Sequence, residues 1–505
     1  MPQGVLPFQY IAEQRGSGMT ALAGLPLYLE LAEVAGLPEA IQRHLGLRER
    51  GQGWTDAQIV MALVLLNVAG GEAVEDLGVL EGDEGFCAVL RKVESHGLGR
   101  RQRRALESRW RKERHRSVPS MSPVFRYLAL FHDPEEEQQR EPHRACIPAS
   151  TAGLQGLRDV NADLVGFVQQ RAPEQTATLD MDATLVGTQK RDALHGYKGF
   201  KCYQPLTTYW AEQGLAVGSE FRDGNVPAGH QQRRVLEGVM DLLPQGIAQV
   251  RLRSDTAGYQ QDLLEYCAEG KHPRFGVVPF VIGVDVTPAF KEAVVETPAE
   301  AWHPLPREVA GEHQRSGQEW AEVCFVPNWI GHKQSSADYR YVAVREPLAQ
   351  EVLAGMEEQL PFPTAEFHQR RYKVHGIVTN RDLPGEEIIA WYRGRCGKSE
   401  EAHAVMKNDL AGGKLPSGDF GENAAWWGIM LLAFNLQRAR QRLALETGWW
   451  TKRLKALRFG LISIPGRVVR HAGSLFVRIR ADHPSYQTLL QVRKRILVLA
   501  LAPPS

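Results

Sequence analysis

The sequence lacks most features of a secreted or membrane-spanning protein. Its most apolar stretches, residues 59–66 and 428–436, are far shorter than the roughly 18 apolar residues that a membrane-spanning helix needs. Residues 1–16 have neither the basic nor the apolar region of a signal peptide. The six cysteines are scattered without a CxxC pair, which argues against a zinc site or a disulfide framework and is typical of reduced thiols. We therefore expect a cytoplasmic protein without a membrane partner.

Net charge is nearly absent, at +1 from 60 basic and 59 acidic side chains in 505 residues. The distribution of charge is nevertheless uneven. Residues 100–116 carry a net charge of +7 and residues 452–505 a net charge of +10, so the rest of the chain has −16. Basic segments of this kind bind phosphates, but each also fits a solvated helix face. Both interpretations stay open from charge alone.

Three common catalytic or nucleotide-binding motifs are missing. Gly397, Lys398 and Ser399 match the end of a phosphate-binding loop, but Tyr392 stands where the first glycine of that motif belongs. Neither H-E-x-x-H nor G-x-S-x-G occurs. The hydrolase classes that depend on these motifs lose their usual support.

The hydrophobic pattern predicts a helical first part and a mixed second part. Residues 1–131 are helical in pattern, with Thr55 and Asp56 placed to cap a helix, and the polar, proline-punctuated residues 132–153 form a linker. Three successive strands and then alternating helices and strands follow, which indicates an α/β fold with a mixed sheet covered by helices. The expected strands are 176–182, 200–210, 214–221, 249–254 and 275–282.

The remainder of the chain is less regular before it becomes helical again. Residues 284–372 are rich in strand-like pieces, a strand at 373–380 leads into one long helix at 386–409, and an apolar helix follows at 426–440. The expected division is a helical domain 1–131, a linker 132–153, a core 154–283, a β-rich insertion 284–372, a second core part 373–445 and a basic C-terminal region 446–505.

Two carboxylates project from one face of the first strand of the core, because Asp180 and Asp182 are two residues apart. They repel one another unless a cation or a proton lies between them. Asp255 lies at the carboxyl end of a later strand, where ligand groups gather in α/β sheets. The alternatives are a solvated strand face for the pair and an N-cap for Asp255.

A third group of charged residues lies on the predicted helix 386–409. Glu400 and Lys407 are seven residues apart and share a helix face, with His403 between them and Arg393 seven residues before Glu400. A carboxylate among cations suits a metal ligand beside phosphate contacts. An exposed helix with regularly spaced charges is the alternative.

Several motifs in a fixed order resemble bacterial insertion-sequence transposases of the DDE group, the group 1 DDE transposase family. They are TLDMDATLV, GYKGFKCYQPL, FRDGNVPAGH, RLRSDTAGY and residues 392–410. The resemblance spans about residues 150–440. It implies an RNase H-like mixed sheet flanked by helices, with a β-rich insertion before the catalytic glutamate, a helical N-terminal DNA-binding domain and a small basic C-terminal region.

The resemblance also implies the site residues. Asp182, Asp255 and Glu400 match the three catalytic, metal-binding acids, and Tyr392, Arg395 and Lys407 match the Tyr/Arg/Glu/Lys signature, whose cations contact DNA phosphates. Arg395 lies five positions before Glu400, one residue more than the usual gap allows, so Arg393 stays as an alternative.

Three carboxylates of this kind hold two Mg²⁺ ions, for which Mn²⁺ substitutes. The implied activity is cut-and-paste DNA transposition by a homodimer that binds the terminal inverted repeats of its element and its target DNA, near the bacterial nucleoid. Trp302, Trp320 and Trp329 are candidates to stack on a flipped base, and core packing is the alternative for each. Two other functions stay open, a domesticated DNA-binding protein without activity and a metal-dependent DNA nuclease.

Overall fold

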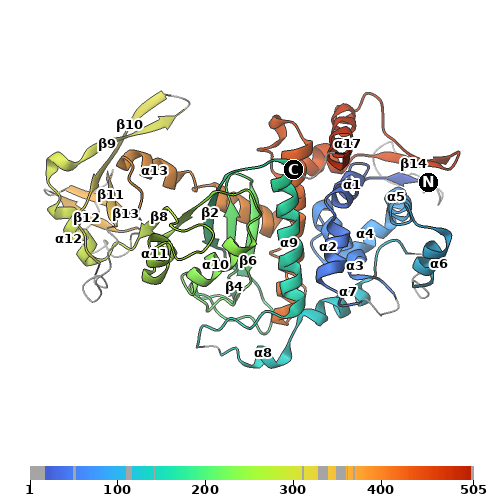
Figure 1. Ribbon diagram of the computed structural model, residues 1–505, viewed down its shortest axis with the longest axis horizontal. Helices are drawn as coiled ribbons and strands as arrows, with labels where there is room; N and C mark the ends of the chain where they lie inside the picture. The colour runs from blue at the N-terminus through green and yellow to red at the C-terminus, as the bar shows by residue number, and fades with distance from the viewer. Residues whose placement is uncertain are drawn as a thin grey trace, which may run out of the picture.

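The computed structural model describes residues 17–48, 53–109, 116–141, 143–309, 312–327, 339–348, 360, 362–367 and 370–501. Trp329 and part of the basic segment 100–116 lie outside the described residues. The molecule is elongated (Figure 1). The strands of the insertion occupy one end, the core sheet lies in the middle, and the N-terminal helices share the other end with the C-terminal elements.

The core sheet has the strand order β6-β5-β2-β7-β8. Its members are β2 (Thr176–Ala183), β5 (Leu206–Trp210), β6 (Leu215–Glu220), β7 (Gln249–Ser254) and β8 (Phe280–Val284). β2 is parallel to β7, which is parallel to β8, whereas β5 is antiparallel to both β2 and β6. In chain order this is 3-2-1-4-5 with only the second strand reversed. The expected α/β fold with an RNase H-like sheet is confirmed.

Two expected strands have different limits in the structure. The expected strand 200–210 divides at Gln204 and Pro205, and its first part forms β4 (Cys202–Tyr203), which pairs with β3 (Val186–Gly187) outside the core sheet. A proline cannot donate to a sheet ladder, so Pro205 marks the division. The expected strand 275–282 begins only at Phe280, after residues that form a turn closed by a bridge between His272 and Gly276.

Two long helices hold the edge of the core sheet. α9 (Ala152–Arg171) and α15 (Phe420–Ala439) pack together beside β6. The buried Asn435 amide donates to Asn161 Oδ1 at 2.7 Å and to Ala216 O at 2.8 Å, while its oxygen accepts from the Ala216 N–H at 2.9 Å. The polar atoms of the buried Asn435 side chain therefore all have hydrogen-bond partners, and these bonds fix both helices on β6. The core also contains α10 (Gln232–Leu242) and α11 (Gln261–Ala268).

The N-terminal helices are α1 (Pro26–Val34), α2 (Leu37–His44), α3 (Asp56–Ala69), α4 (Leu77–Gly82), α5 (Glu84–Glu94), α6 (Arg100–Arg109) and α7 (Met121–Leu128). Of these, α1, α3 and α7 pack on α15, which α9 and β6 also cover, so α15 is buried along nearly all of its length. The expected cap of α3 is confirmed, because Thr55 and Gln58 form a capping box.

One observation bears on membranes. Among the described residues no single helix is long and apolar enough to cross a membrane, and one bent pair, Asp56–Ala69 with Val74–Gly82, passes on length and composition alone.

The strands of the insertion continue the core sheet. β13 (Arg370–Thr379) pairs antiparallel with β8, and β11 (Arg340–Pro347), β10 (Glu312–Glu322) and β9 (His303–Val309) follow in that order. β12 (Thr364–Phe367) pairs with β13, and α12 (Pro288–Glu296) lies beside it. Ten strands therefore form one sheet within the described residues. Backbone pairing between β13 and β8 connects the insertion to the core.

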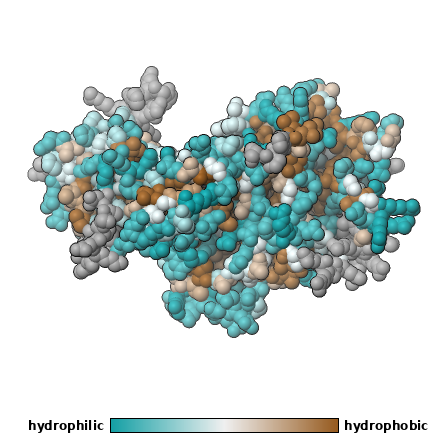
Figure 2. Space-filling model, in the orientation of Figure 1, coloured by the Kyte–Doolittle hydropathy of each residue, from teal (hydrophilic) through white to brown (hydrophobic). Residues whose placement is uncertain are grey.

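The C-terminal region returns to the N-terminal helices. The hairpin of β14 (Gly466–His471) and β15 (Ser474–Arg478) pairs with β1 (Met19–Thr20), and α17 (Tyr486–Leu501) packs on α1. Hydrophobic residues gather on the surface near α17 (Figure 2), where Leu490, Leu497 and Val498 are exposed. Both ends of the described chain thus build one module, which we call the terminal module (α1–α7 with β1, β14, β15 and α17).

Candidate active site

The polar side chains of Thr178, Asp180 and Asp182 lie on one face of β2 and differ in their surroundings. Thr178 binds Glu212 through its hydroxyl at 2.6 Å and its N–H at 2.8 Å. Arg253 on the neighbouring β7 donates from Nε and Nη2 to the two oxygens of Asp180 at 2.6 and 2.8 Å, and both side chains are buried. Within the described residues, Asp182, near the end of the strand, has no arginine bound to it as Asp180 has. Asp180 is therefore a structural residue, although it shares the strand face with Asp182.

Asp255 is brought beside Asp182 by the parallel pairing of β2 and β7. Met181 and Ser254 are paired, so the next residue on each strand is an aspartate at the same edge of the sheet. The Oδ1 atom of Asp255 accepts the Ala257 N–H at 3.0 Å and caps a short 3₁₀ turn. The N-cap interpretation of Asp255 is thus correct, and it leaves the other carboxylate oxygen directed to the site.

The expectation of one continuous helix over residues 386–409 is wrong. The chain forms three pieces, namely α13 (Gly385–Arg393), α14 (Lys398–Ala404) and the π-helical segment η7 (Val405–Asp409). The break covers residues 394–397, where Gly397 has a φ of 81°, a left-handed conformation that glycine adopts without strain. Residues on the two sides of the break therefore do not share a helix face as they would in one continuous helix.

The break decides which arginine lies at the site. Arg395 is within the break, is only 6% exposed, and places Nη2 3.8 Å from Oδ2 of Asp255. Arg393 is on the last turn of α13, is exposed, and donates from Nη2 to the Gln318 side chain of β10 at 2.9 Å. The structure places Arg395 among the acids and directs Arg393 to the insertion.

Glu400 completes the group from the first turn of α14. Its Oε2 atom accepts the Gly397 N–H at 2.7 Å, which orients the carboxylate at the start of the helix. Burial raises the pKa of Asp182 to about 7, the Arg395 charge opposes this rise, and the charges of Asp255 and Glu400 add to it. The three acids thus share one electrostatic environment around Arg395.

Tyr392 and Lys407 approach the same place from α13 and η7. Tyr392 is buried against β8, where a Cβ on Gly283 would come within 2.9 Å of its hydroxyl oxygen, so glycine leaves room for the ring. Burial raises the pKa of Tyr392 to about 12, which keeps it a hydrogen-bond donor. The Lys407 ammonium donates to Leu185 O at 3.4 Å, just beyond β2.

His403 is a neighbour of Asp182 to which the sequence analysis gives no role. Its Nδ1 atom lies 3.8 Å from Oδ2 of Asp182, and its side chain is buried. Burial and the charge of Lys407 lower the pKa of His403 to about 4, so the imidazole is neutral at physiological pH. Two sequence signals point to it: the three-residue spacing from Glu400, which places both on one side of α14, and the spacing of Glu400, Glu401, His403 and Lys407, which matches the resembled family.

The residues fit a divalent cation in their chemistry. Three carboxylates offer the oxygen ligands that hard cations prefer. Burial, with the charges of Asp255 and Glu400 in addition, raises the pKa of Asp182, and a cation bound beside it would act in the opposite direction. Nε of the buried Arg395 and Oγ of the buried Ser399 have no hydrogen-bond partner among the described residues, which suits an anionic ligand. Among those residues no three acidic, His or Cys side chains are yet gathered at metal-binding distances.

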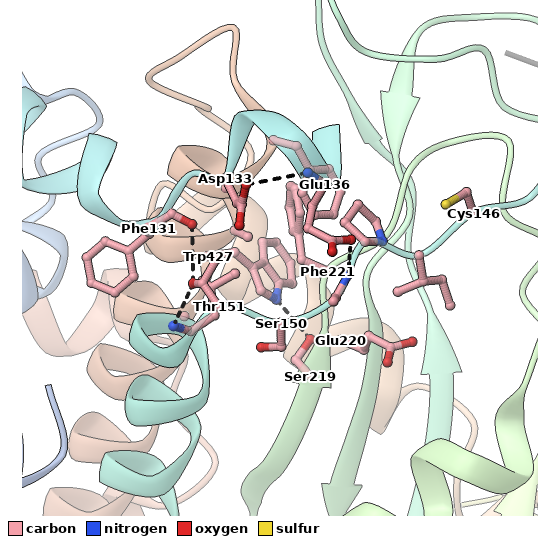
Figure 3. Close-up of a pocket in the computed structure, with 18 of the residues that line it drawn as sticks. Phe131, Asp133, Glu136, Cys146, Ser150, Thr151, Ser219, Glu220, Phe221 and Trp427 are labelled. Atoms are coloured by element: carbon pink, nitrogen blue, oxygen red, sulfur yellow. Dashed lines mark hydrogen bonds between the residues drawn. The ribbon is translucent and has the colours of Figure 1, made fainter. Parts of the chain in front are cut away.

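A cavity of about 780 Å³ lies away from the acids, beneath the linker (Figure 3). The linker crosses the core here and is held by Arg140, whose guanidinium donates to both oxygens of the buried Asp223 at 2.5 and 2.7 Å. Asp223 belongs to the motif FRDGNVPAGH, which thereby has a structural role. The labelled lining includes Phe131, Glu136, Thr151, Ser219, Phe221 and Trp427.

Comparison with known proteins decides the family. The description "Transposase DDE domain group 1" matches residues 9–501, nearly the whole chain. The chain belongs to the group 1 DDE transposase family. It is thus a DNA transposase, as the motifs predict, and the enzymes of this family act with divalent metal ions.

Other comparisons add little. No curated protein matches the chain. Among solved structures it is similar to the piggyBac transposase in a synaptic complex with hairpin DNA, with 9% identity, a TM-score of 0.35, and coverage of 87% of this chain and 85% of that chain.

The raised pKa of Asp182 predicts a pH-dependent stability of the metal-free transposase. The folded protein retains a proton on Asp182 between about pH 4 and 7, where the unfolded chain has lost it, so stability falls as the pH rises through this window. Asp182→Asn cannot ionise, so its Tm should exceed that of the wild type at pH 8 and match it near pH 4. Thermal unfolding in EDTA tests this, and parallel pH profiles of the two proteins would disprove it.

Asp180→Asn is the matched control for this experiment. It leaves Arg253 buried without its partner, so it should destabilise the protein by about 3–5 kcal/mol across the same pH range. Two aspartates on one strand face should therefore have opposite effects on stability at pH 8.

The position of Arg395 predicts unequal effects of two nearby arginines on catalysis. Arg395→Ala should reduce cleavage of a DNA duplex that carries an element end by roughly 10²- to 10³-fold, the usual loss when a donor to developing charge is removed. Arg393→Ala should remain within about threefold of the wild type, since it loses a surface contact. Equal losses in both variants, with unchanged Tm, would contradict the assignment of Arg395.

Proposed function

We propose that this transposase binds the terminal inverted repeats of an insertion sequence as a dimer, cleaves the DNA at each end, and joins the ends to target DNA. The observation that supports this most is that Asp182 and Asp255 lie at one edge of the sheet, with Arg395 3.8 Å from Asp255 and the charge of Glu400 acting on Asp182. A nuclease that cuts without joining would use the same acids, so the two activities differ only in their products. A domesticated DNA-binding protein would have no need of a shared acidic centre.

The metal in this proposal is Mg²⁺, with Mn²⁺ as a substitute. Asp182, Asp255 and Glu400 would hold two such ions, which lower the pKa of the attacking hydroxyl and stabilise the leaving oxygen. In cleavage the nucleophile is water, which leaves a 3′-hydroxyl on the DNA. In joining that 3′-hydroxyl attacks a target phosphodiester and displaces a target 3′-oxygen. One centre thus serves both steps because only the nucleophile changes.

The surrounding side chains of this chain have separate tasks. Arg395 carries the charge and the donor geometry that suit a phosphate next to the acids. Tyr392 offers a neutral hydroxyl from the buried end of α13. His403 stays neutral beside Asp182 and therefore does not compete with a metal ion for that carboxylate.

The terminal module is the proposed site for recognition of the inverted repeats. On α6 the arginines of the first turns are exposed, and the hairpin β14–β15 exposes further arginines beside the half-exposed Phe476. α5 connects the two, because it precedes α6 and packs on β1 and β14. The exposed arginines are Arg100, Arg101, Arg103, Arg104, Arg467, Arg470 and Arg478. Two basic segments distant in sequence thereby belong to one module.

Not all cations of the C-terminal segment are available to DNA. Arg458 is partly buried and donates to Val68 O at 2.7 Å and to Asn67 O at 2.5 Å, at the end of α3. Arg453 pairs with Asp409 at 3.2 Å. These side chains fasten the segment to the rest of the protein, and the exposed hairpin remains for phosphates.

The three acids can be tested by conservative substitution. Asp182→Asn, Asp255→Asn and Glu400→Gln should each reduce Mg²⁺-dependent cleavage of an end-bearing duplex by at least roughly 10³-fold, because each removes a charged metal ligand. Glu401→Gln is the matched control, since it changes an exposed neighbour on the same helix, and it should cleave like the wild type. Undiminished cleavage by any of the first three variants would reject the site.

The products of the wild-type reaction separate the two enzyme functions. With a target plasmid present, a transposase yields joined strands on a sequencing gel, whereas a nuclease yields cleaved ends only. Persistent absence of joined products at full cleavage would favour the nuclease.

The terminal module predicts a salt-dependent interaction despite the nearly neutral chain. Removing two phosphate contacts, in Arg101→Gln/Arg104→Gln or in Arg470→Gln/Arg478→Gln, should reduce the slope of log affinity against log salt by up to about 2. Fluorescence anisotropy with an end-bearing duplex measures this slope. Arg158→Gln/Arg370→Gln is the control, with two exposed arginines outside the module. A wild-type affinity that does not change with salt would contradict the proposed surface.

A further inference from the structure

The motif GYKGFKCYQPL has no role in the site described so far. It lies largely in the loop between β3 and β4, residues 188–201, which we call the β3–β4 loop. This loop starts shortly after Asp182 and returns to the core sheet at β5. Within this motif Tyr197, Lys198 and Phe200 are exposed.

The β3–β4 loop is an ordered structure. The Gly196 N–H donates to Phe200 O at 2.9 Å, and the Gly199 N–H donates to Gly196 O at 2.9 Å. Glycine is required at both positions of this turn. Gly199 has a φ of +79°, and a Cβ on Gly196 would come within 2.6 Å of the Cys202 sulfur. The turn therefore holds the side chains at its tip in a defined place.

The tip of the loop exposes two aromatic rings among cations. Tyr197 is 76% exposed and Phe200 is 42% exposed. Lys198 lies between them in sequence, with its ammonium 5.7 Å from the centre of the Tyr197 ring, and His195 is exposed as well. Aromatic rings with neighbouring cations form the surface that binds bases and phosphates of unpaired nucleic acid.

The loop is fixed next to the catalytic acids. Lys407 donates to Leu185 O, directly before β3, at 3.4 Å. Lys190 donates from Nζ to Pro416 O at 3.0 Å, in the segment that follows η7. Burial lowers the pKa of Lys407, the charge of Asp182 opposes this, and the charge of Lys198 lowers the pKa further. Two lysines that repel one another beside an acidic centre suit a phosphate between them.

We propose that the β3–β4 loop holds an unpaired nucleotide of the DNA at the cleavage site, with Tyr197 and Phe200 stacked on its base and Lys198 on its phosphate. This inference rests on the proposed function, because the DNA must lie at Asp182. An unpaired base is favoured over a paired one, since the faces of a paired base are covered by its neighbours in the helix. A protein partner is less favoured, because cations flank both rings.

Binding in EDTA, where no cleavage occurs, tests the loop apart from catalysis. The probes are two fluorescent duplexes with one end sequence, taken from inverted repeats beside the gene. One is fully paired, and the other has three unpaired nucleotides next to the cleavage site. The full-length wild type should bind the second about 10-fold more tightly. Tyr197→Ala/Phe200→Ala should bind both equally, and Tyr197→Phe, which keeps the ring, should resemble the wild type.

Phe459→Ala is the control, because it removes another exposed ring, 88% exposed, from the C-terminal region. It should keep the wild-type preference. The same preference in the wild type and in the double alanine variant would overturn the proposal. The double variant could also keep the DNA preference and show a changed oligomeric state in light scattering. This result would overturn the proposal in favour of a protein contact.

Cleavage of DNA with a single abasic site provides a second test. When the abasic site is at the contacted nucleotide, Tyr197 and Phe200 have no base to stack on, so the wild type and the double alanine variant should cleave this DNA at equal rates. On intact DNA the wild type should cleave about 10-fold faster than the variant. A constant ratio at every abasic position would overturn the proposal. A wild type that shows the binding preference and never cleaves would instead reject the proposed function and leave the loop assignment supported.

Discussion

Asp182, Asp255 and Glu400 repel one another, and the fold has to hold them together against this repulsion. Parallel pairing of β2 with β7 fixes the two aspartates at one edge of the sheet. The break between α13 and α14 places Arg395 3.8 Å from Asp255, and the backbone N–H groups of Gly397 and Ala257 orient Glu400 and Asp255. Burial first, and then the charges of Asp255 and Glu400, raise the pKa of Asp182, and a bound cation would oppose this rise.

Around this centre some charged side chains are paired inside the fold, and others are exposed and can contact DNA. Asp180 and Arg253 neutralise one another in the interior, Asp223 and Arg140 fasten the linker to the core, and Arg458 holds the end of α3. The available cations lie elsewhere, on the terminal module and on the β3–β4 loop. A net charge near zero is thus compatible with DNA binding, since the opposite charges occupy different parts of the surface.

Local signals in the sequence predict the elements that depend on local chemistry. The cap at Thr55 and the strands β2, β6 and β7 follow from residue type and alternation within a few positions. The family motifs add the three acids and the signature residues. Each of these predictions needs only a short window of sequence or a recognised pattern.

Contacts between distant segments could not be predicted in this way. The charge spacing continues across residues 394–397, whereas the folded backbone breaks there at Gly397 and brings Arg395 to Asp255. The partner of Asp180 comes from the neighbouring parallel strand, 73 residues away. The union of the two basic segments depends on pairing of β1 with β14 across most of the chain. In each case packing of the folded chain decides between alternatives that the sequence leaves equal.

Direct measurement of metal binding tests the central claim that the three acids form one centre. Electron paramagnetic resonance of Mn²⁺ added to the full-length protein reports bound ions without any DNA or catalysis. We expect specific Mn²⁺ binding to the wild type and to Glu401→Gln, and its loss in Asp182→Asn, Asp255→Asn and Glu400→Gln alike. Unchanged Mn²⁺ binding in these three variants would contradict it.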